Sequence, residues 1–232
     1  SPLTEADLRA DRVIRQGVEQ HFAGVFILSE ESVSAGEQQA QCFFLVDPLD
    51  GTKEFISRNG EFTVNIALIE NGRPVLGVVY APAIGEIYAG GVGQGARAAK
   101  VLNGTIGAWH DISVRPCPGG GISVLASRSH LTDETKAFVE KFAVADFVSA
   151  GSSLKFCKLA AGEADLYPRL GRTMEWDTAA GDAILRAADG GVMTMDGKPL
   201  LYGKRNQAED VDFANPWFVA AGRFDPFPDV TE

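Results

Sequence analysis

Three observations predict an α/β fold built from two halves. Residues 1–111 combine a helical pattern with a long run of β-structure, whereas short strands and helices alternate from residue 122 onward. Between them lies Pro116-Cys117-Pro118-Gly119-Gly120-Gly121, which has only six residues and is therefore a hinge rather than a flexible linker. We expect an N-terminal α+β half at residues 1–115 and a C-terminal α/β half at residues 116–232.

The first half is expected to open with a helix and to continue as a sheet. Leu8, Ile14, Val18 and Phe22 mark the helix, and the residues after Thr52 predict a second, short one. Asn71-Gly72 is a hairpin signal between two apolar runs. The strands expected in this half lie at residues 25–28, 42–46, 62–69, 74–80, 84–89 and 95–101.

The second half is expected to alternate strands with helices. Thr132 reads as the cap of a helix that carries Phe138, Val139 and Phe142. A helix of small residues over 177–189 ends at Gly190-Gly191. The other elements expected here are strands at 122–125, 147–148, 165–167, 191–195 and 217–220, and a helix at 152–161.

Composition excludes several classes of protein. A chain of 232 residues can bury one large core or two packed halves. Its net charge of −10 argues against a nucleic acid polymer as partner. The sequence contains no run of about 18 apolar residues, so a membrane span is not expected. Cys42, Cys117 and Cys157 are too few and too scattered for a disulfide framework, so we expect a reducing cytoplasm.

The stretch Asp47-Pro48-Leu49-Asp50-Gly51-Thr52 is the main candidate site. Its two carboxylates and the Leu49 carbonyl are oxygen ligands of the kind that Mg²⁺ takes. The N–H groups of Gly51 and Thr52, at the start of a helix, can hold a phosphate. Taken alone, such an acidic turn is more often a solvated loop.

Other acidic residues in the chain make a metal site the better interpretation of this turn. Asp177 reads as the N-cap or a first-turn residue of a helix whose Ala180, Ile184 and Ala187 face the core. The pair Glu30-Glu31 follows an apolar strand, and Asp7 precedes the first helix. Each of these acids alone would be assigned to the surface, but together they form a recognisable set.

Four motifs, taken in their order along the chain, resemble those of the inositol monophosphatase family. They are Leu-Thr-Glu-Ala-Asp (3–7), Ser-Glu-Glu (29–31), Asp-Pro-Leu-Asp-Gly-Thr (47–52) and Trp-Asp-Thr-Ala-Ala-Gly (176–181). The resemblance covers nearly the whole chain. It implies a layered α-β-α-β-α sandwich of the inositol monophosphatase and fructose-1,6-bisphosphatase type, with a Mg²⁺-dependent, Li⁺-sensitive active site between the halves. Asp-Gly-Thr-Lys-Glu-Phe (50–55) is similar to the CysQ-type 3′(2′),5′-bisphosphate nucleotidases of that family.

The resemblance implies the roles of the acidic residues. Two or three Mg²⁺ ions would be held by Glu30, Asp47, Asp50, Asp177 and the Leu49 carbonyl. Asp7 would pair with Thr52 to orient a metal-bound water for attack on phosphorus, and Glu30 would take part in this catalysis. Glu31 is expected in an outer position or on the surface. The metals would also offset the repulsion among these acids.

Substrate residues are expected outside the acidic set. The resemblance implies contacts from His130, Ser152, Lys155 and Arg169 in addition to Gly51 and Thr52. Lys155 and Arg169 suit a second phosphate, although both could be ordinary surface cations. Ser127, Ser129 and Ser153 show no His/Asp arrangement nearby, so no covalent phosphoenzyme is expected.

The implied activity is hydrolysis of adenosine 3′,5′-bisphosphate to AMP and phosphate, a reaction of sulfur metabolism. The alternatives are hydrolysis of inositol monophosphate or fructose 1,6-bisphosphate, and a non-catalytic protein that binds metal or nucleotide. The expected partner is a small phosphorylated nucleotide, with a homodimer and peripheral attachment to the inner membrane face as further possibilities. The abrupt start at a functional motif suggests a missing or cleaved segment before Ser1.

Overall fold

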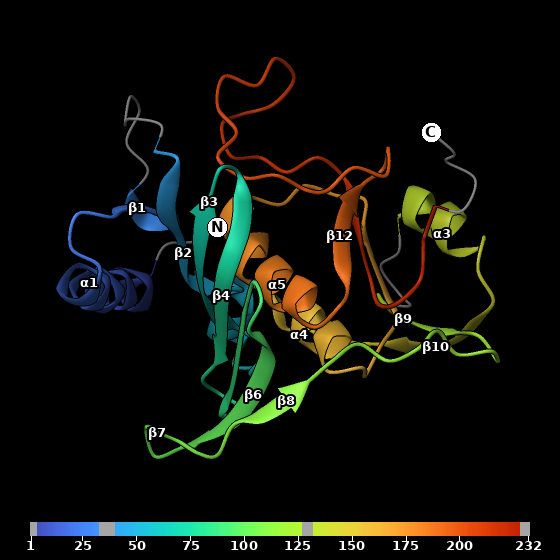
Figure 1. Cartoon of the computed structure of the whole chain (residues 1–232), viewed down its shortest axis with the longest axis horizontal. Helices are drawn as coiled ribbons and strands as arrows, with labels where there is room; N and C mark the ends of the chain where they lie inside the picture. Colours follow the sequence, from blue (N-terminus) through green and yellow to red (C-terminus); the bar gives the residue numbers. More distant parts are fainter. Residues whose placement is uncertain (1–3, 33–39, 127–131, 228–232) are drawn as a thin grey trace.

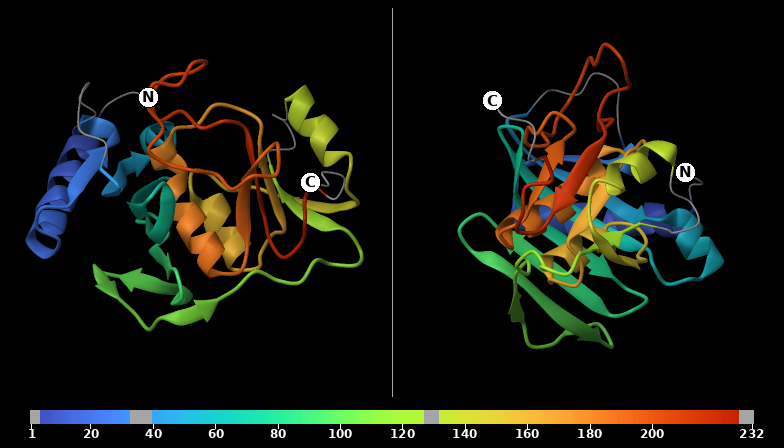
Figure 2. Two further views of the ribbon diagram at one scale, coloured as in Figure 1. Left: turned by 45° about the horizontal axis from the view of Figure 1, so that its top comes forward. Right: turned by 90° about the vertical axis from the view of Figure 1, so that its right-hand side faces the viewer.

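The computed structural model describes residues 4–32, 40–126 and 132–227 and shows five layers. Helix α1 (Glu5–His21) covers the outer face of a first sheet, and helices α4 (Leu154–Ala160) and α5 (Glu175–Ala187) lie against its other face. A second sheet follows, with α3 (Asp133–Val139) on its far side (Figure 1). Figure 2 shows the same order of layers after rotation. The layered α-β-α-β-α arrangement expected from the sequence is therefore confirmed.

The first sheet is antiparallel except at one edge. Its strands follow the order β1-β2-β3-β4-β5-β6-β7, β8 also pairs with β6, and only β1 and β2 run parallel. The predicted hairpin turn at Asn71 and Gly72 is present, with φ of 50° and 76° at these residues. Its strands are β1 (Phe26–Ser29), β2 (Cys42–Asp50), β3 (Thr63–Glu70), β4 (Arg73–Ala81), β5 (Glu86–Gly91), β6 (Gly95–Leu102), β7 (Thr105–Ile106) and β8 (His110–Ile112).

The second sheet is mixed and has the order β10-β9-β11-β13-β12. Strands β9, β10 and β11 are parallel, whereas β13 is antiparallel to β11 and to β12. Its strands are β9 (Ile122–Leu125), β10 (Val144–Val148), β11 (Leu166–Arg169), β12 (Gly191–Thr194) and β13 (Phe218–Ala221). All strands expected in the two halves are present, while β7 and β8 were not predicted.

The helices also lie near their predicted positions. Thr4 caps α1, with its hydroxyl accepting from the Ala6 N–H, and Thr132 caps α3 as expected. The short helix after Gly51 is α2 (Thr52–Ser57), and η1 (Glu30–Ser32) is a single 3₁₀ turn after β1. Helix α5 begins at Glu175, two residues before the predicted start at Asp177. No helix in the described ranges has both the length and the apolar character needed to cross a membrane.

Helix α5 lies unusually close to the first sheet because two paired strand residues are glycines. Gly77 of β4 pairs with Gly90 of β5 beneath the helix. A Cβ at Gly77 would overlap the Ala180 carbonyl oxygen, and one at Gly90 would lie 2.8 Å from the Ile184 Cα. Side chains at these two positions would therefore push α5, and the residues at its start, away from the sheet.

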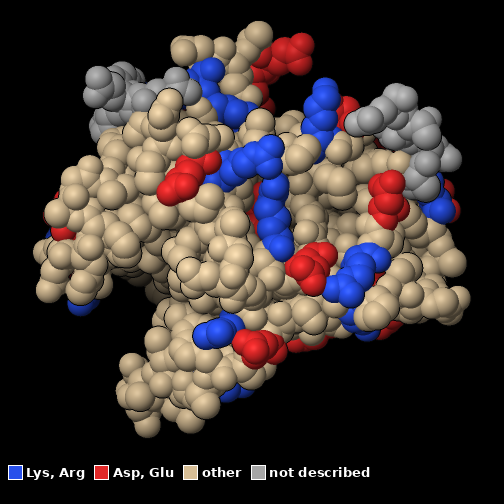
Figure 3. Space-filling model, viewed as in Figure 1, with Lys and Arg blue, Asp and Glu red and all other residues tan. Residues whose placement is uncertain are grey.

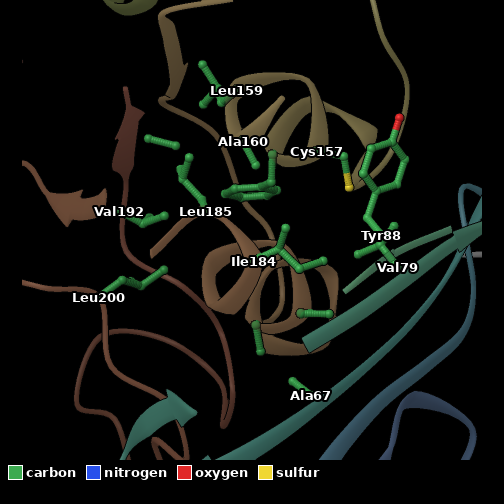
Figure 4. Close-up of a cluster of buried hydrophobic side chains, with 14 of the residues drawn as sticks. Ala67, Val79, Tyr88, Cys157, Leu159, Ala160, Ile184, Leu185, Val192 and Leu200 are labelled. Atoms are coloured by element: carbon green, nitrogen blue, oxygen red, sulfur yellow. The ribbon is translucent and has the colours of Figure 1, made fainter. Parts of the chain in front are cut away.

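The main core lies between the first sheet and helices α4 and α5. Figure 4 shows Ala67, Val79 and Tyr88 from the sheet facing Ile184 and other buried residues of the two helices. Helix α4 approaches α5 closely at Gly181, where a Cβ would lie 2.6 Å from ring atoms of Phe156. The two helices thus act as one layer that is packed on both faces.

The contact at Gly181 can be tested with a matched pair of substitutions. We expect Gly181→Ala to lower the free energy of unfolding by about 1–3 kcal/mol, because the added methyl group overpacks a buried helix contact. Gly17→Ala is the control, since Gly17 is in the exposed part of α1 and has nothing within 4 Å of an added Cβ. Gly17→Ala should raise the free energy of unfolding by up to about 1 kcal/mol, because alanine favours a helix more than glycine does. Equal effects in urea unfolding would contradict this description of the α4–α5 contact.

Candidate active site

A cluster of three carboxylates forms the centre of the candidate site. Oxygen atoms of Asp47, Asp50 and Asp177 all lie within 4.8 Å of one another. Asp47 and Asp50 come from the end of β2, and Asp177 comes from the first turn of α5. The cluster therefore joins the first sheet to the second half of the chain, and its oxygen donors suit a hard divalent cation.

An irregularity in β2 places Asp47 and Asp50 on the same side of the sheet. Asp47 pairs with Asn65 and Asp50 pairs with Thr63, so three steps along β2 match two steps along β3. In a regular strand, residues three apart point to opposite faces, and the extra residue corrects this. The prediction that the strand ends before Asp47 is wrong, because β2 continues through this irregularity to Asp50. Pro48 is tolerated there because the ladder is already interrupted.

The start of α5 fixes Asp177. Met174 is the N-cap, and the Asp177 Oδ2 accepts a hydrogen bond of 2.8 Å from the Met174 N–H. Of the two alternatives predicted for Asp177, the first-turn position is therefore correct and the N-cap is wrong. A carboxylate here satisfies a free helix donor and interacts favourably with the helix dipole.

Glu30 and Glu31 follow β1 in the turn η1 and both are half-buried. Burial first and then Asp50 raise the pKa of Glu30, while the neighbouring Asp47 opposes that shift. Burial and the neighbouring Glu30 raise the pKa of Glu31 to about 7. Glu30 is therefore next to the cluster, as expected for a further ligand, whereas Glu31 is not an open surface residue.

The negative charge of the acidic cluster is only partly compensated by neighbouring cations. Burial, followed by repulsion from Asp50, Glu30 and Asp177, raises the pKa of Asp47 well above its usual range. Burial also raises the pKa of Asp50, although Lys155 opposes this effect. Burial and then Asp50 raise the pKa of Asp177 to about 7. A bound cation would remove this repulsion, so the residues present fit a divalent metal.

The structure places the other predicted residues of the first half close to this cluster. Asp7 is 2 % exposed and accepts from the Thr4 N–H at 2.8 Å, while its charge raises the pKa of Glu30. Thr52 is buried, and its hydroxyl donates to the Leu49 carbonyl at 3.5 Å. The pairing of Asp7 with Thr52 stays a prediction. Gly51 has φ of 89°, where a Cβ would also collide with the Ser152 hydroxyl, so this position requires glycine.

Two adjoining cavities open beside the cluster. The smaller one, of about 240 Å³, is lined by Asp50, Gly51, Ser152, Lys155, Arg169 and Asp177 among others. The larger one, of about 370 Å³, shares Ser152, Lys155 and Arg169 with it and extends past Leu125, Pro168 and Leu170. Four predicted substrate or metal residues from the second half thus meet Asp50 and Gly51 in one place. His130 lies outside the described residues.

Lys155 and Arg169 are half-buried cations of the cavity wall rather than free surface charges. The Lys155 Nζ lies 5.5 Å from the centre of the Tyr167 ring and donates to the Ser152 carbonyl at 3.4 Å. Burial lowers the pKa of Lys155, and Asp50 opposes that shift. The Arg169 Nη2 donates to the Arg172 carbonyl, but its buried Nε has no hydrogen-bond partner within the described ranges. Both side chains are therefore suited to an anion in the cavity.

Sequence reasoning missed the residues that hold Asp50. Its Oδ2 accepts from the Ser153 N–H at 2.8 Å and from the Asn65 amide at 3.4 Å, and it lies 3.1 Å from the Ser153 hydroxyl oxygen. The sequence analysis did not pair Ser153 with Asp50, because the two residues are 103 positions apart and only the fold brings them together. Asn65 carried a detectable signal, since it is a polar residue on the buried face of β3, where Ala67 and Ile69 follow it at alternate positions.

Comparisons with known proteins agree with this arrangement. The sequence model described as "Inositol monophosphatase family" matches residues 1–223. The chain is 46% identical over 220 residues to the 3′(2′),5′-bisphosphate nucleotidase CysQ of Escherichia coli, with 94% of this chain and 84% of that protein covered.

Solved structures show the same relationship. CysQ from Bacteroides thetaiotaomicron is 39% identical with a TM-score of 0.77, covering 93% of this chain and 84% of the other. An inositol monophosphatase from Anabaena is 26% identical with a TM-score of 0.74, and the match covers 94% of this chain and 82% of the other. The fold, the acidic cluster and the match over residues 1–223 together show that the chain belongs to the inositol monophosphatase family.

Proposed function

We propose that this protein is a Mg²⁺-dependent phosphatase that hydrolyses adenosine 3′,5′-bisphosphate to AMP and phosphate. The observation that carries this proposal is the cavity shared by Asp50 and Asp177 on one side and Lys155 and Arg169 on the other. One wall suits metal ions and the reacting phosphate, and the other suits a second phosphate. The identity of 46% with a 3′(2′),5′-bisphosphate nucleotidase supports the same substrate class.

The metal site would consist of the three clustered aspartates, Glu30 and the Leu49 carbonyl, holding two or three Mg²⁺ ions. When bound, Mg²⁺ supplies Lewis-acid charge that lowers the pKa of water and stabilises the leaving oxygen. The cluster's excess of buried negative charge is the structural reason to expect such ions.

The chain's own groups would orient the reaction. The Asp7 carboxylate and the Thr52 hydroxyl would hold the attacking water and take up its proton. The N–H groups of Gly51 and Thr52 would bind phosphate oxygens at the start of α2. As the new water–phosphorus bond forms, the bond between phosphorus and the 3′ oxygen breaks, and the released 3′ oxygen gains a proton.

The second phosphate would lie on Lys155 and Arg169, with Ser152 beside them, and His130 is proposed to join them. The larger cavity has room for the nucleoside, since ligand pockets typically measure about 300–1,000 Å³. Hydrolysis of inositol monophosphate would leave both cations without a matching phosphate. A substrate panel that includes inositol monophosphate and fructose 1,6-bisphosphate tests these alternatives directly.

We place the protein in a reducing cytoplasm and divide it into halves at residues 1–115 and 116–232, with the active site between them. Cys42, Cys117 and Cys157 are all free thiols, which supports a reducing compartment. The net charge of −10 argues against a nucleic acid polymer as substrate, and the face drawn in Figure 3 carries acidic side chains among the basic ones. The homodimer stays a prediction, and no observation supports attachment to the inner membrane face.

Asp50→Asn tests the metal assignment. We expect phosphate release from adenosine 3′,5′-bisphosphate to fall by at least about 10²-fold at saturating Mg²⁺, the lower range for losing one catalytic group. The amide keeps the shape of the side chain but removes its charge, so the rise in melting temperature on adding Mg²⁺ should also shrink. Near-normal turnover by the folded variant would reject Asp50 as a ligand.

Lithium should inhibit the reaction. Li⁺ has a radius close to that of Mg²⁺ and half its charge, so it can occupy a metal position without replacing the function of Mg²⁺. We expect phosphate release to fall as LiCl is added in the sub-millimolar to millimolar range, with NaCl at equal ionic strength as the control. Equal rates in the two salts would argue against the proposed site geometry.

Lys155→Ala and Arg169→Ala test the second-phosphate site. Each should lower kcat/KM for adenosine 3′,5′-bisphosphate. The corresponding loss of transition-state stabilisation should be about 1.5–3 kcal/mol, the range for hydrogen bonds to charged groups. Hydrolysis of 3′-AMP should change much less, because that molecule lacks the second phosphate. Lys158→Ala is the matched control, since Lys158 is on the same helix but pairs with Glu163. Equal losses on both substrates would assign the two cations to structure or to the metal site.

A further inference from the structure

Ser153 occupies a junction between three elements of the site. It is the N-cap of α4 and is only 1% exposed. Its hydroxyl lies 2.6 Å from the Asp177 carbonyl oxygen and 3.1 Å from the Asp50 Oδ2. Its backbone N–H donates to the same Asp50 oxygen at 2.8 Å. One residue therefore contacts two members of the acidic cluster that come from different halves of the chain.

Asn65 completes this junction from the first sheet. Its Nδ2 donates to the Ser153 hydroxyl at 2.8 Å and lies 3.4 Å from the Asp50 Oδ2. Its Oδ1 is buried and has no partner within the described ranges. A buried amide oxygen beside Asp50 is explained if water molecules around a bound cation donate to it.

The hydrogen-bond directions make the junction specific. The Asn65 amide can only donate through Nδ2, so the Ser153 oxygen accepts from it and is left to donate its single proton. The shorter of the two available contacts is to the Asp177 carbonyl, which leaves the Ser153 N–H as the main donor to Asp50. The hydroxyl thus ties Asn65 to the first turn of α5, while the backbone of the same residue holds the Asp50 carboxylate.

We propose that Ser153, together with Asn65, is a positioning residue that holds Asp50 and Asp177 at the spacing a divalent cation requires. Without such a tie, repulsion between the two half-buried carboxylates favours their separation. The proposal rests on the proposed metal site, but it does not depend on which phosphate ester is the substrate. Residues that orient metal ligands typically contribute about 10–100-fold to metal affinity.

The test measures Mn²⁺ binding in the absence of substrate. Electron paramagnetic resonance reports the concentration of free Mn²⁺ during the titration. We expect Ser153→Ala to weaken Mn²⁺ binding about 10–100-fold while the far-ultraviolet circular dichroism stays that of the wild type. Asn65→Ala should weaken binding in the same range. The double variant should lose less than the product of the two single losses, because both substitutions remove one shared junction.

Ser123→Ala is the matched control. Ser123 is a half-buried serine whose hydroxyl accepts from the Arg115 guanidinium at 2.9 Å, in the second sheet and outside both cavities. Its substitution should leave Mn²⁺ affinity unchanged. An equal loss in Ser123→Ala, or wild-type affinity in folded Ser153→Ala, would overturn the proposal. If Ser153→Ala does not fold, Asn65→Ala decides: weaker binding supports the junction, and unchanged binding overturns it.

A second readout separates positioning from general destabilisation. With Mg²⁺ varied at saturating nucleotide, Ser153→Ala should raise the Mg²⁺ concentration for half-maximal rate by the same factor as the Mn²⁺ affinity falls. The maximal rate should recover at high Mg²⁺, whereas a partly unfolded enzyme would lose rate at every concentration. A wild-type enzyme that binds Mn²⁺ but leaves adenosine 3′,5′-bisphosphate intact would reject the proposed substrate and leave the Mn²⁺ result on Ser153 standing.

Discussion

The need to keep three carboxylates, one buried and two half-buried, within 4.8 Å of one another governs much of this structure. Like charges at this distance repel strongly where water is excluded, and the raised pKa values of Asp47 and Asp177 record that cost. Protein groups offset only part of it. Hydrogen bonds from Leu49, Ser153 and Met174 each hold one carboxylate, and Lys155 opposes the rise in the pKa of Asp50. The repulsion that is left over would favour binding of a cation.

Packing of α5 supplies the geometry that hydrogen bonds alone could not. Asp177 reaches the end of β2 only because the helix lies directly on the paired glycines of β4 and β5. Its own small residues allow the approach from the other side, with Gly181 against the Phe156 ring. The stability of the core and the spacing of the acidic cluster therefore depend on the same close contacts. Substitutions that enlarge these residues should disturb the site even though they lie outside it.

The sequence predicted the element order, the hairpin at Asn71-Gly72 and the three clustered aspartates, because these depend on local patterns and on motifs that stay intact along the chain. It did not predict that β2 continues to Asp50, since a strand irregularity depends on register with β3. It also missed Ser153, whose partner in the fold is 103 residues away. The two-residue shift at the start of α5 has a local origin, because the Asp177 carboxylate accepts from the N–H of Met174, the N-cap residue three positions earlier.

The same geometry would couple the proposed metal site to the proposed second-phosphate site. The two residues that precede α4 both contact Asp50, through the Ser152 hydroxyl on its carbonyl and the Ser153 N–H on its carboxylate. The first turn of the same helix then presents Lys155 to the cavity. A displacement of Asp50 would therefore move the cation proposed to bind the second phosphate. Because such coupling is reciprocal, nucleotide held by Lys155 should in turn favour the arrangement of Asp50 that binds metal.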